Sequence, residues 1–223
     1  MPSIQQNIEH ITSQLPKGVR LVAVSKYHPV EKLQEAYKAG LRIFGENHAQ
    51  ELVAKRPLLP ADIEWHFIGH LQTNKVRMIM PDVSLTHAID SIKLAKTVNK
   101  EAARINRTVD VLLQLHVAQE ESKSGFTVSE LLENFTLNQF KGLDNMRICG
   151  LMAMATNTCD SKQVSKEFSI VHNTFEIIKE EFFADKDFFK EISMGMSHDW
   201  PIAVENGSTM VRIGTDIFGE REY

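Results

Sequence analysis

The amino-acid sequence predicts an α/β protein, a single (β/α)8 barrel of the TIM type with an extra helix at its N-terminus. Eight short apolar or β-branched runs alternate with segments of helical periodicity, which implies a parallel sheet with right-handed crossovers. Eight is the number of parallel strands that closes into a barrel. The 223 residues fit one such barrel, so we expect residues 1–223 to form a single domain.

The first helix and the first strand set this pattern. Apolar residues recur at helical spacing from Ile4 to Leu15, and Pro16 ends the helix. The run at residues 21–24 is apolar and lies between turn signals, which predicts a buried strand. Pro29 then opens the next helix.

The later elements follow from the same two periodicities. The remaining strands are predicted at residues 41–44, 64–68, 84–89, 109–117, 147–153, 191–194 and 210–213. The helices between them are predicted at residues 29–39, 47–56, 72–80, 91–105, 162–182 and 198–205, with a further helix that begins at a capping box of Thr127 and Glu130. An open doubly wound sheet is the alternative fold. It lacks its main support, because no GxGxxG follows the first strand.

The composition limits the partners and the cellular compartment that we expect for this protein. The net charge is −4 and no long basic run occurs, so we expect no nucleic-acid partner. The N-terminal segment lacks the apolar stretch of a signal peptide, and no apolar run is long enough to span a bilayer. We therefore expect a cytoplasmic protein without a membrane partner. A disulfide between Cys149 and Cys159 is conceivable, but two reduced thiols are expected in that compartment.

The residues that end the strands should form the functional site, because barrel sites lie at the carboxyl ends of the strands. Lys26 directly follows the first apolar strand. Partial desolvation at that position favours a neutral, nucleophilic amine. The alternative is a structural lysine whose ammonium reaches solvent at the rim.

A phosphate site is expected near the last two strands, where such barrels commonly hold a phosphate. Ser197 supplies a hydroxyl there, and Gly214 and Thr215 form a turn that lets backbone N–H groups approach an anion. Arg212 lies on the last strand. Its guanidinium is suited to an aromatic nitrogen or a carboxylate, and a rim ion pair is the alternative.

No metal site is expected. His66 and His70 are four residues apart near Glu64, but a path from strand to loop would not keep both rings on one face. The methionines of the later strands are expected to pack in the core, and some of them to line the site.

Six segments of this sequence resemble the pyridoxal phosphate homeostasis proteins, and together they run from about Leu21 to Arg221. They are AVSK at 23–26, FGEN at 44–47, WHFIGHLQTNK at 65–75, SKSG at 122–125, GLM at 150–152 and SMGMSHDWPIAVENGSTMVRIGTDIFGER at 193–221. The resemblance implies a fold similar to the barrel domain of alanine racemase and a bound pyridoxal 5'-phosphate (PLP).

The resemblance also implies a role for each residue of the site. Lys26 would form the internal aldimine with PLP, and Arg212 would face the pyridine nitrogen. An arginine there keeps that nitrogen unprotonated and weakens the ring as an electron sink. Three residues would hold the phosphate: Ser197, Gly214 and Thr215. Three others would line the ring pocket: Asn47, His66 and Met152.

Three positions depart from the pattern of that family. His48 stands where an aromatic residue such as tyrosine is more common, and His198 replaces a residue that is more often acidic or small. Asp216 follows Gly214 and Thr215, where a small residue is more common. A carboxylate so close to a phosphate weakens the local positive potential unless it points away.

Three functions remain open at this point. The first is a non-catalytic carrier that buffers or delivers PLP and makes transient contact with PLP-dependent apo-enzymes, as a monomer or a weak dimer. The second is an amino-acid racemase, which needs two bases on opposite faces of the substrate. The chain offers only Tyr27, Tyr37 and Tyr223 as tyrosines and no room for a second domain. The third, a Schiff-base aldolase, usually carries its lysine on a later strand. The sequence favours the carrier.

Overall fold

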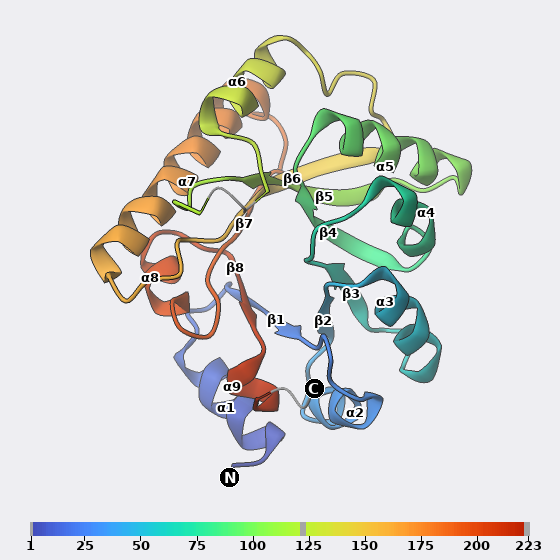
Figure 1. The fold of residues 1–223 in the computed structure, drawn as a ribbon, viewed down its shortest axis with the longest axis vertical. Coiled ribbons are helices and arrows are strands. Elements are labelled where there is room, and N and C mark those ends of the chain that lie inside the picture. The colour runs from blue at the N-terminus through green and yellow to red at the C-terminus, as the bar shows by residue number, and fades with distance from the viewer. Residues whose placement is uncertain (1, 121–123, 221–223) are drawn as a thin grey trace.

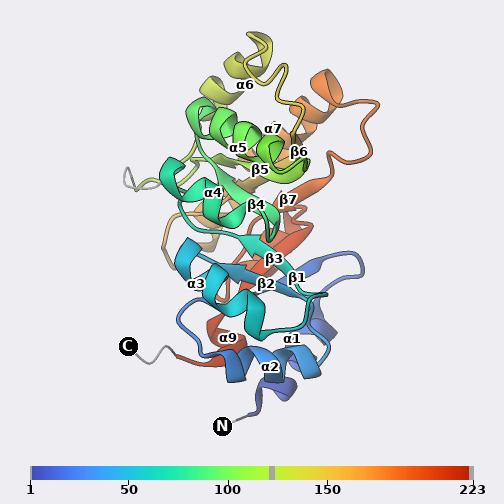
Figure 2. The same cartoon turned by 90° about the vertical axis from the view of Figure 1, so that its right-hand side faces the viewer.

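A computed structural model describes residues 2–120 and 124–220 and shows a closed barrel (Figure 1). Eight parallel strands are hydrogen-bonded in chain order, and the last strand pairs with the first, Leu21 opposite Val211. Helices surround this sheet, as the perpendicular view in Figure 2 also shows. The predicted (β/α)8 barrel is therefore confirmed.

The elements alternate along the chain. The strands are β1 (Arg20–Val24), β2 (Ile43–Glu46), β3 (Glu64–Phe67), β4 (Val83–Ile89), β5 (Val109–Leu115), β6 (Met146–Ala153), β7 (Glu191–Ser193) and β8 (Met210–Ile213). The α-helices are α1 (Ile4–Gln14), α2 (Val30–Lys38), α3 (Ala49–Lys55), α4 (Val76–Ile79), α5 (Ile92–Arg104), α6 (Val128–Thr136), α7 (Ser161–Phe182), α8 (Trp200–Glu205) and α9 (Thr215–Phe218). Two short 3-10 helices are η1 (Arg56–Leu58) and η2 (Thr73–Lys75).

The predicted bounds of β2 and β5 were wrong by two residues at one end or both. The Leu41 N–H donates to the Ala36 carbonyl and prolongs the end of α2, so strand pairing begins only at Ile43. The His116 N–H donates to the Phe126 carbonyl, which takes the chain out of the sheet after Leu115. The prediction also missed α9, whose four residues are too few to show a helical period.

Helix α1 is the predicted extra helix. It buries Ile8 and Ile11 and packs against α2 and α9, and the three helices lie together at the lower end of the view in Figure 1. The capping box predicted at Thr127 is present, with the Thr127 hydroxyl accepting from the Glu130 N–H and the Glu130 carboxylate accepting from the Thr127 N–H. None of the described helices has the length and apolar character needed to cross a membrane.

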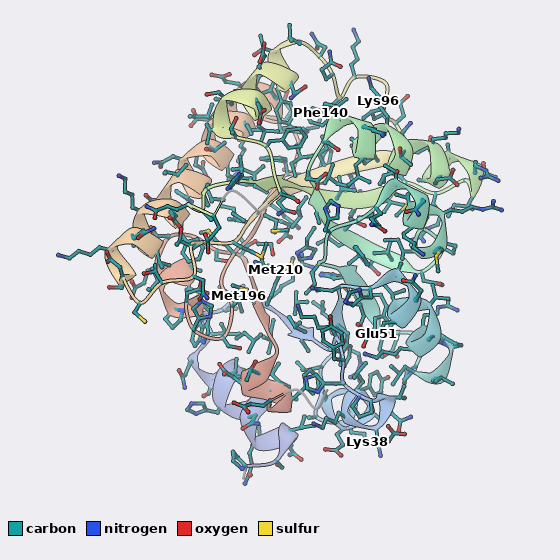
Figure 3. All side chains as sticks on the ribbon, in the orientation of Figure 1. Lys38, Glu51, Lys96, Phe140, Met196 and Met210 are labelled. Carbon is teal, nitrogen blue, oxygen red and sulfur yellow. The ribbon has the colours of Figure 1, made fainter. Side chains whose placement is uncertain are left out.

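The barrel has two apolar cores because alternate strand residues face opposite sides of the sheet. The outward-facing residues pack against the helices and form the larger cluster. The inward-facing cluster fills the barrel, with Met210 near its middle (Figure 3). Its members are Val22, Leu85, Ala88, Leu112, Cys149, Met152 and Met210.

A bulge in β6 decides which residues join this inner core. The pairing of β6 with β5 shifts register between Ile148 and Gly150. The extra residue lets Cys149 and Met152 both face inward while Leu151 packs outward. Gly150 has φ +152°, and a Cβ there would lie 1.8 Å from the Glu191 carbonyl oxygen, so the close approach of β7 requires glycine.

Candidate functional site

The carboxyl ends of β1 and β8 lie side by side, and Lys26 emerges at this junction. The Ser25 N–H donates to the Gly45 carbonyl at 3.0 Å, which carries the sheet one residue past β1. On the other side, a Cβ at Gly214 would lie 3.1 Å from the Val24 carbonyl oxygen, so glycine lets β8 approach the base of the Lys26 turn. Lys26 itself is half-buried. The predicted lysine therefore lies next to the predicted glycine turn.

The turn that carries Lys26 is held from both sides. Before it, the Ser25 carbonyl accepts a hydrogen bond from Lys55 Nζ at 2.7 Å. After it, the Tyr27 N–H donates to Glu51 Oε1 at 2.6 Å. Tyr27 adopts φ +66°, in the left-handed region that costs a residue with a side chain about 1 kcal/mol or more. The surrounding contacts therefore impose this backbone conformation on the turn.

These contacts belong to a charged cluster between β2 and α3, where Figure 3 labels Glu51. Lys55 Nζ lies 2.8 Å from Glu46 Oε1 and 2.6 Å from Glu51 Oε1, and the Ser25 hydroxyl donates to Glu46 Oε1 at 2.6 Å. Glu46 and Lys55 are both buried. Burial raises the pKa of Glu46 to about 7, although Lys55 acts to lower it. Sequence reasoning missed this cluster, whose one signal was the i,i+4 spacing of Glu51 and Lys55.

Asn47 follows β2 on the same rim. A Cβ at Gly69 would lie 2.5 Å from the Asn47 carbonyl oxygen, so glycine allows the loop after β3 to pack against Asn47. The Asn47 side-chain oxygen Oδ1 is buried and has no hydrogen-bond partner among residues 2–120 and 124–220. A buried amide oxygen without a partner is a candidate contact for a ligand.

Arg212 is buried inside the barrel, and its guanidinium donates to groups at the ends of β6 and β7. Nη1 donates to the Ser193 carbonyl at 2.8 Å and to the Ser193 hydroxyl at 2.6 Å, and Nη2 donates to the Ala153 carbonyl at 3.0 Å. Burial lowers the pKa of Arg212 to about 10, and the charge of Asp199 opposes this. Arg212 forms no ion pair within the described part of the chain, so the predicted alternative of a rim ion pair was wrong.

A chain of buried polar side chains leads from Arg212 across the barrel. The Ser193 hydroxyl lies 3.0 Å from His87 Nδ1, and His87 Nε2 lies 3.0 Å from His66 Nδ1. Burial lowers the pKa of His66 to about 3 and lowers the pKa of His87 well below its ordinary value, so both rings are neutral. His66 is thus joined to Arg212 through two intervening side chains. Its predicted place in a ring pocket stays a prediction.

The connection from β7 to α8 brings Ser197 next to the start of α9. The buried Asp199 carboxylate accepts from the Met196 N–H and fixes this connection. Partial burial raises the pKa of Asp216, and the nearby Ser197 side chain acts to lower it. Thr215, the first residue of α9, is exposed at the same rim. The structure therefore brings together the predicted phosphate residues, and it places the Asp216 carboxylate among them.

The other residues discussed from the sequence have structural partners. Met152 is buried in the inner core. His70 Nδ1 lies 3.1 Å from Asp90 Oδ2, so His70 and His66 face different partners. No cluster of three or more His, Cys, Asp or Glu side chains suited to a metal occurs in the described ranges. Both cysteines are free thiols. Two residues of the SKSG motif, at positions 122 and 123, lie outside the described residues, as does Tyr223.

Comparison with known proteins defines the class. Residues 1–222 match the family model of the N-terminal domain of alanine racemase. A relative from Vibrio alginolyticus, a pyridoxal phosphate homeostasis protein, is 41% identical over 238 residues that cover 100% of both chains. The chain belongs to this family of pyridoxal phosphate homeostasis proteins, as the motifs predicted.

Two solved structures of PipY from Synechococcus elongatus PCC7942 give the same answer at the level of the fold. Both are 35% identical to this chain and cover 97% of it and 100% of PipY. The structure without PLP superposes with a TM-score of 0.91, and the structure with PLP bound superposes with a TM-score of 0.88.

Proposed function

We propose that this protein binds PLP covalently through Lys26 and acts in intracellular PLP homeostasis, as a buffer or carrier of the cofactor. The observation that carries the proposal is the pairing of β1 with β8, which sets the Lys26 turn beside Gly214 and puts Arg212 on the neighbouring strand. The PLP bound to the similar PipY structure and the name of the Vibrio relative support it.

The residues on the rim fit the parts of PLP. The Lys26 amine condenses with the aldehyde and releases water. The anionic phosphate would be held by Ser197, the Thr215 hydroxyl and the backbone of Gly214. The unpartnered Oδ1 of Asn47 and the buried side chain of Met152 would contact the ring. His66 would act at a distance, through the chain that ends on Arg212.

Arg212 bears on whether the protein is an enzyme. PLP, when bound, supplies an electron sink that stabilises carbanions. Arg212 remains protonated at neutral pH even with a lowered pKa. It can therefore donate a hydrogen bond to a pyridine nitrogen but cannot accept one from a protonated pyridine N–H. It would keep that nitrogen unprotonated and the sink weak. The geometry therefore supports a carrier better than a catalyst of strong carbanion chemistry.

The two tyrosines that the structure describes support the same choice, because racemisation needs a second base across from the lysine. Tyr37 donates to the Asp62 carboxylate at 2.8 Å, away from the rim. The Tyr27 hydroxyl lies 2.8 Å from His48 Nε2, and the ring is 46% exposed. We expect no alanine racemisation, and turnover of ~1 per second or more would favour the racemase instead.

Absorbance tests the covalent attachment. The protein loaded with PLP should show a band near ~420 nm that borohydride removes. Lys26→Ala should abolish the band. Lys32→Ala is the control and should retain it, because the Lys32 ammonium donates to the Phe218 carbonyl on α9. A band of unchanged intensity in Lys26→Ala would assign the attachment to another amine.

Delivery needs a separate assay. Loaded protein should restore activity to a PLP-dependent apo-enzyme when the two are mixed. A comparison across a dialysis membrane would show whether transfer depends on contact. Equal rates with and without the membrane would mean that the protein only releases PLP to solution.

A further inference from the structure

The mouth of the barrel opposite Lys26 holds a cavity of about 760 Å³. It is lined by side chains from the amino-terminal ends of the strands, including Arg20, Glu64, His66, Arg147, Lys190 and Glu191. Neither Lys26 nor Ser197 is among the residues that line it. Small-molecule sites commonly measure ~300–1,000 Å³, so the cavity has the size of a ligand site.

Ion pairs hold the walls of this cavity in place. Arg20 Nη2 lies 2.9 Å from Glu191 Oε1, and the Thr209 hydroxyl donates to Glu191 Oε2 at 2.9 Å. On the other side, Arg147 donates from Nε and Nη2 to the two oxygens of Asp110, at 2.7 and 2.8 Å. A bidentate arginine–carboxylate pair fixes both side chains, so the walls are preformed.

His66 forms the floor and has one ring nitrogen to offer. The side chain is 1% exposed, and its Nδ1 is engaged by His87. Its Nε2 has no hydrogen-bond partner in the part of the chain that the structure describes, and the residue lines the cavity. Because the residue lines the cavity, a bound ligand can hydrogen-bond to this nitrogen.

The direction of the buried chain makes this nitrogen a donor. Arg212 can only donate hydrogen bonds, so the Ser193 hydroxyl oxygen accepts from it. The Ser193 O–H then donates to His87 Nδ1. His87 then donates from Nε2 to His66 Nδ1, and the His66 proton must lie on Nε2. The opposite direction would leave the Ser193 proton without an acceptor among the described residues. The His66 N–H therefore points at an acceptor on the ligand.

The charges of the rim indicate the rest of the ligand. Arg20 lies close enough for its charge to act on the His66 ring, which favours a carboxylate at the floor. The cavity is also lined by Glu64, Asp187 and Lys190, two acids and one base for which the described part of the chain provides no ion pair. This excess of negative charge favours an ammonium group near the opening.

We propose that the cavity is a second binding site that takes a small zwitterion, a free α-amino acid. The carboxylate accepts from the His66 N–H beside Arg20, and the ammonium group faces Glu64 and Asp187. This site does not depend on Lys26 or on bound PLP. Because its hydrogen-bond chain ends on Arg212, occupancy at one mouth of the barrel polarises the arginine at the other.

Nitrogen NMR of the histidine rings tests the site directly. The probes are L-alanine, propionate, which lacks the ammonium group, and L-alaninamide, which lacks the carboxylate. The ¹⁵N-histidine-labelled chain is titrated as Lys26→Ala, so that no amino acid reacts with PLP, and His66→Asn assigns the signal. L-alanine should shift the His66 Nε2–H signal saturably, near ~1 mM, and each truncated probe should bind at least about tenfold more weakly. No saturable shift, or equal binding of propionate, would overturn the proposal.

A matched pair of arginine variants completes the test. Arg20→Gln should weaken L-alanine binding about tenfold, whereas Arg42→Gln should leave it within about twofold. Each arginine forms its own ion pair, Arg20 with Glu191 at 2.9 Å and Arg42 with Asp62 at 3.0 Å, and the two side chains are 38% and 43% exposed. Arg42 does not line the cavity. Equal effects of the two substitutions would refute the site. The ~420 nm band of wild-type protein loaded with PLP is recorded separately, so a failure here is distinct from a failure of the PLP proposal.

Discussion

Lys55→Met removes the ammonium group that holds the turn before Lys26. Three acceptors lose a donor, namely the Ser25 carbonyl, Glu46 Oε1 and Glu51 Oε1. The methionine fills a similar volume, so the change is mainly electrostatic. Removing one partner of a buried ion pair costs about 3–5 kcal/mol, because the other charge stays buried. We expect a loss of this size, a large part of the ~5–15 kcal/mol that stabilises a domain.

The loss of stability in Lys55→Met should depend on pH, and the pKa of Glu46 decides whether the loss grows or shrinks as pH rises. Burial raises the pKa of Glu46 to about 7 in the folded protein, above the ordinary value of 4.5. The folded state therefore binds this proton more tightly than the unfolded state, and the stability it contributes is lost as pH rises through the folded pKa. Without Lys55, which lowers that pKa, the loss extends to higher pH. Lys55→Met should cost more at pH 8.5 than at pH 6, by about 1.4 kcal/mol for each unit of further shift.

Urea unfolding followed by circular dichroism at both pH values measures the effect. Lys38→Met, on the exposed end of α2 labelled in Figure 3, is the control and should change the free energy of unfolding by less than about 0.5 kcal/mol. Adding Glu46→Gln to Lys55→Met should remove most of this pH dependence, because the buried carboxylate of the cluster is then gone. A loss below about 1 kcal/mol, or one equal at both pH values, would show that Lys55 does not compensate the charge of Glu46.

Two further substitutions test the fold and the site. Gly150→Ala puts a Cβ 1.8 Å from the Glu191 carbonyl oxygen and should lower the free energy of unfolding by more than about 4 kcal/mol. Gly142→Ala, where φ is +79° and the space is open, should lower it by about 1–2 kcal/mol. Equal melting temperatures of the two variants would contradict this. Asp216→Asn removes a negative charge beside Ser197. It should tighten PLP binding about two- to fivefold at pH 8. Because the pKa of Asp216 is raised, the gain should shrink at pH 5, and a titration showing no gain at either pH would contradict it.

The fold could be predicted because each strand carries its own signal. Apolar runs such as residues 109–115 predict buried parallel strands, and eight such strands predict a closed barrel. The residues at which the strands begin and end were harder to predict. They depend on single hydrogen bonds, such as that from Leu41 to Ala36, which no local pattern encodes. Helix α9 was missed because one turn of helix has no period to detect.

The site divides in the same way. Lys26, Ser197 and Thr215 could be predicted because their places after the strands follow from the topology. The partners that fix them could not, because they come from pairs distant in the chain, such as Arg212 with Ser193 and Lys55 with Ser25. His87 carried a weak signal, as a polar residue within an apolar strand, but its partners depend on the closure of the barrel.

Covalent attachment through Lys26 is tested most directly by locating PLP on the chain. Protein loaded with PLP is reduced with borohydride, digested and mapped by mass spectrometry. We predict a pyridoxyl group on the peptide that contains Lys26, at one equivalent per chain. A pyridoxyl group on a different lysine, with Lys26 unmodified, would contradict it.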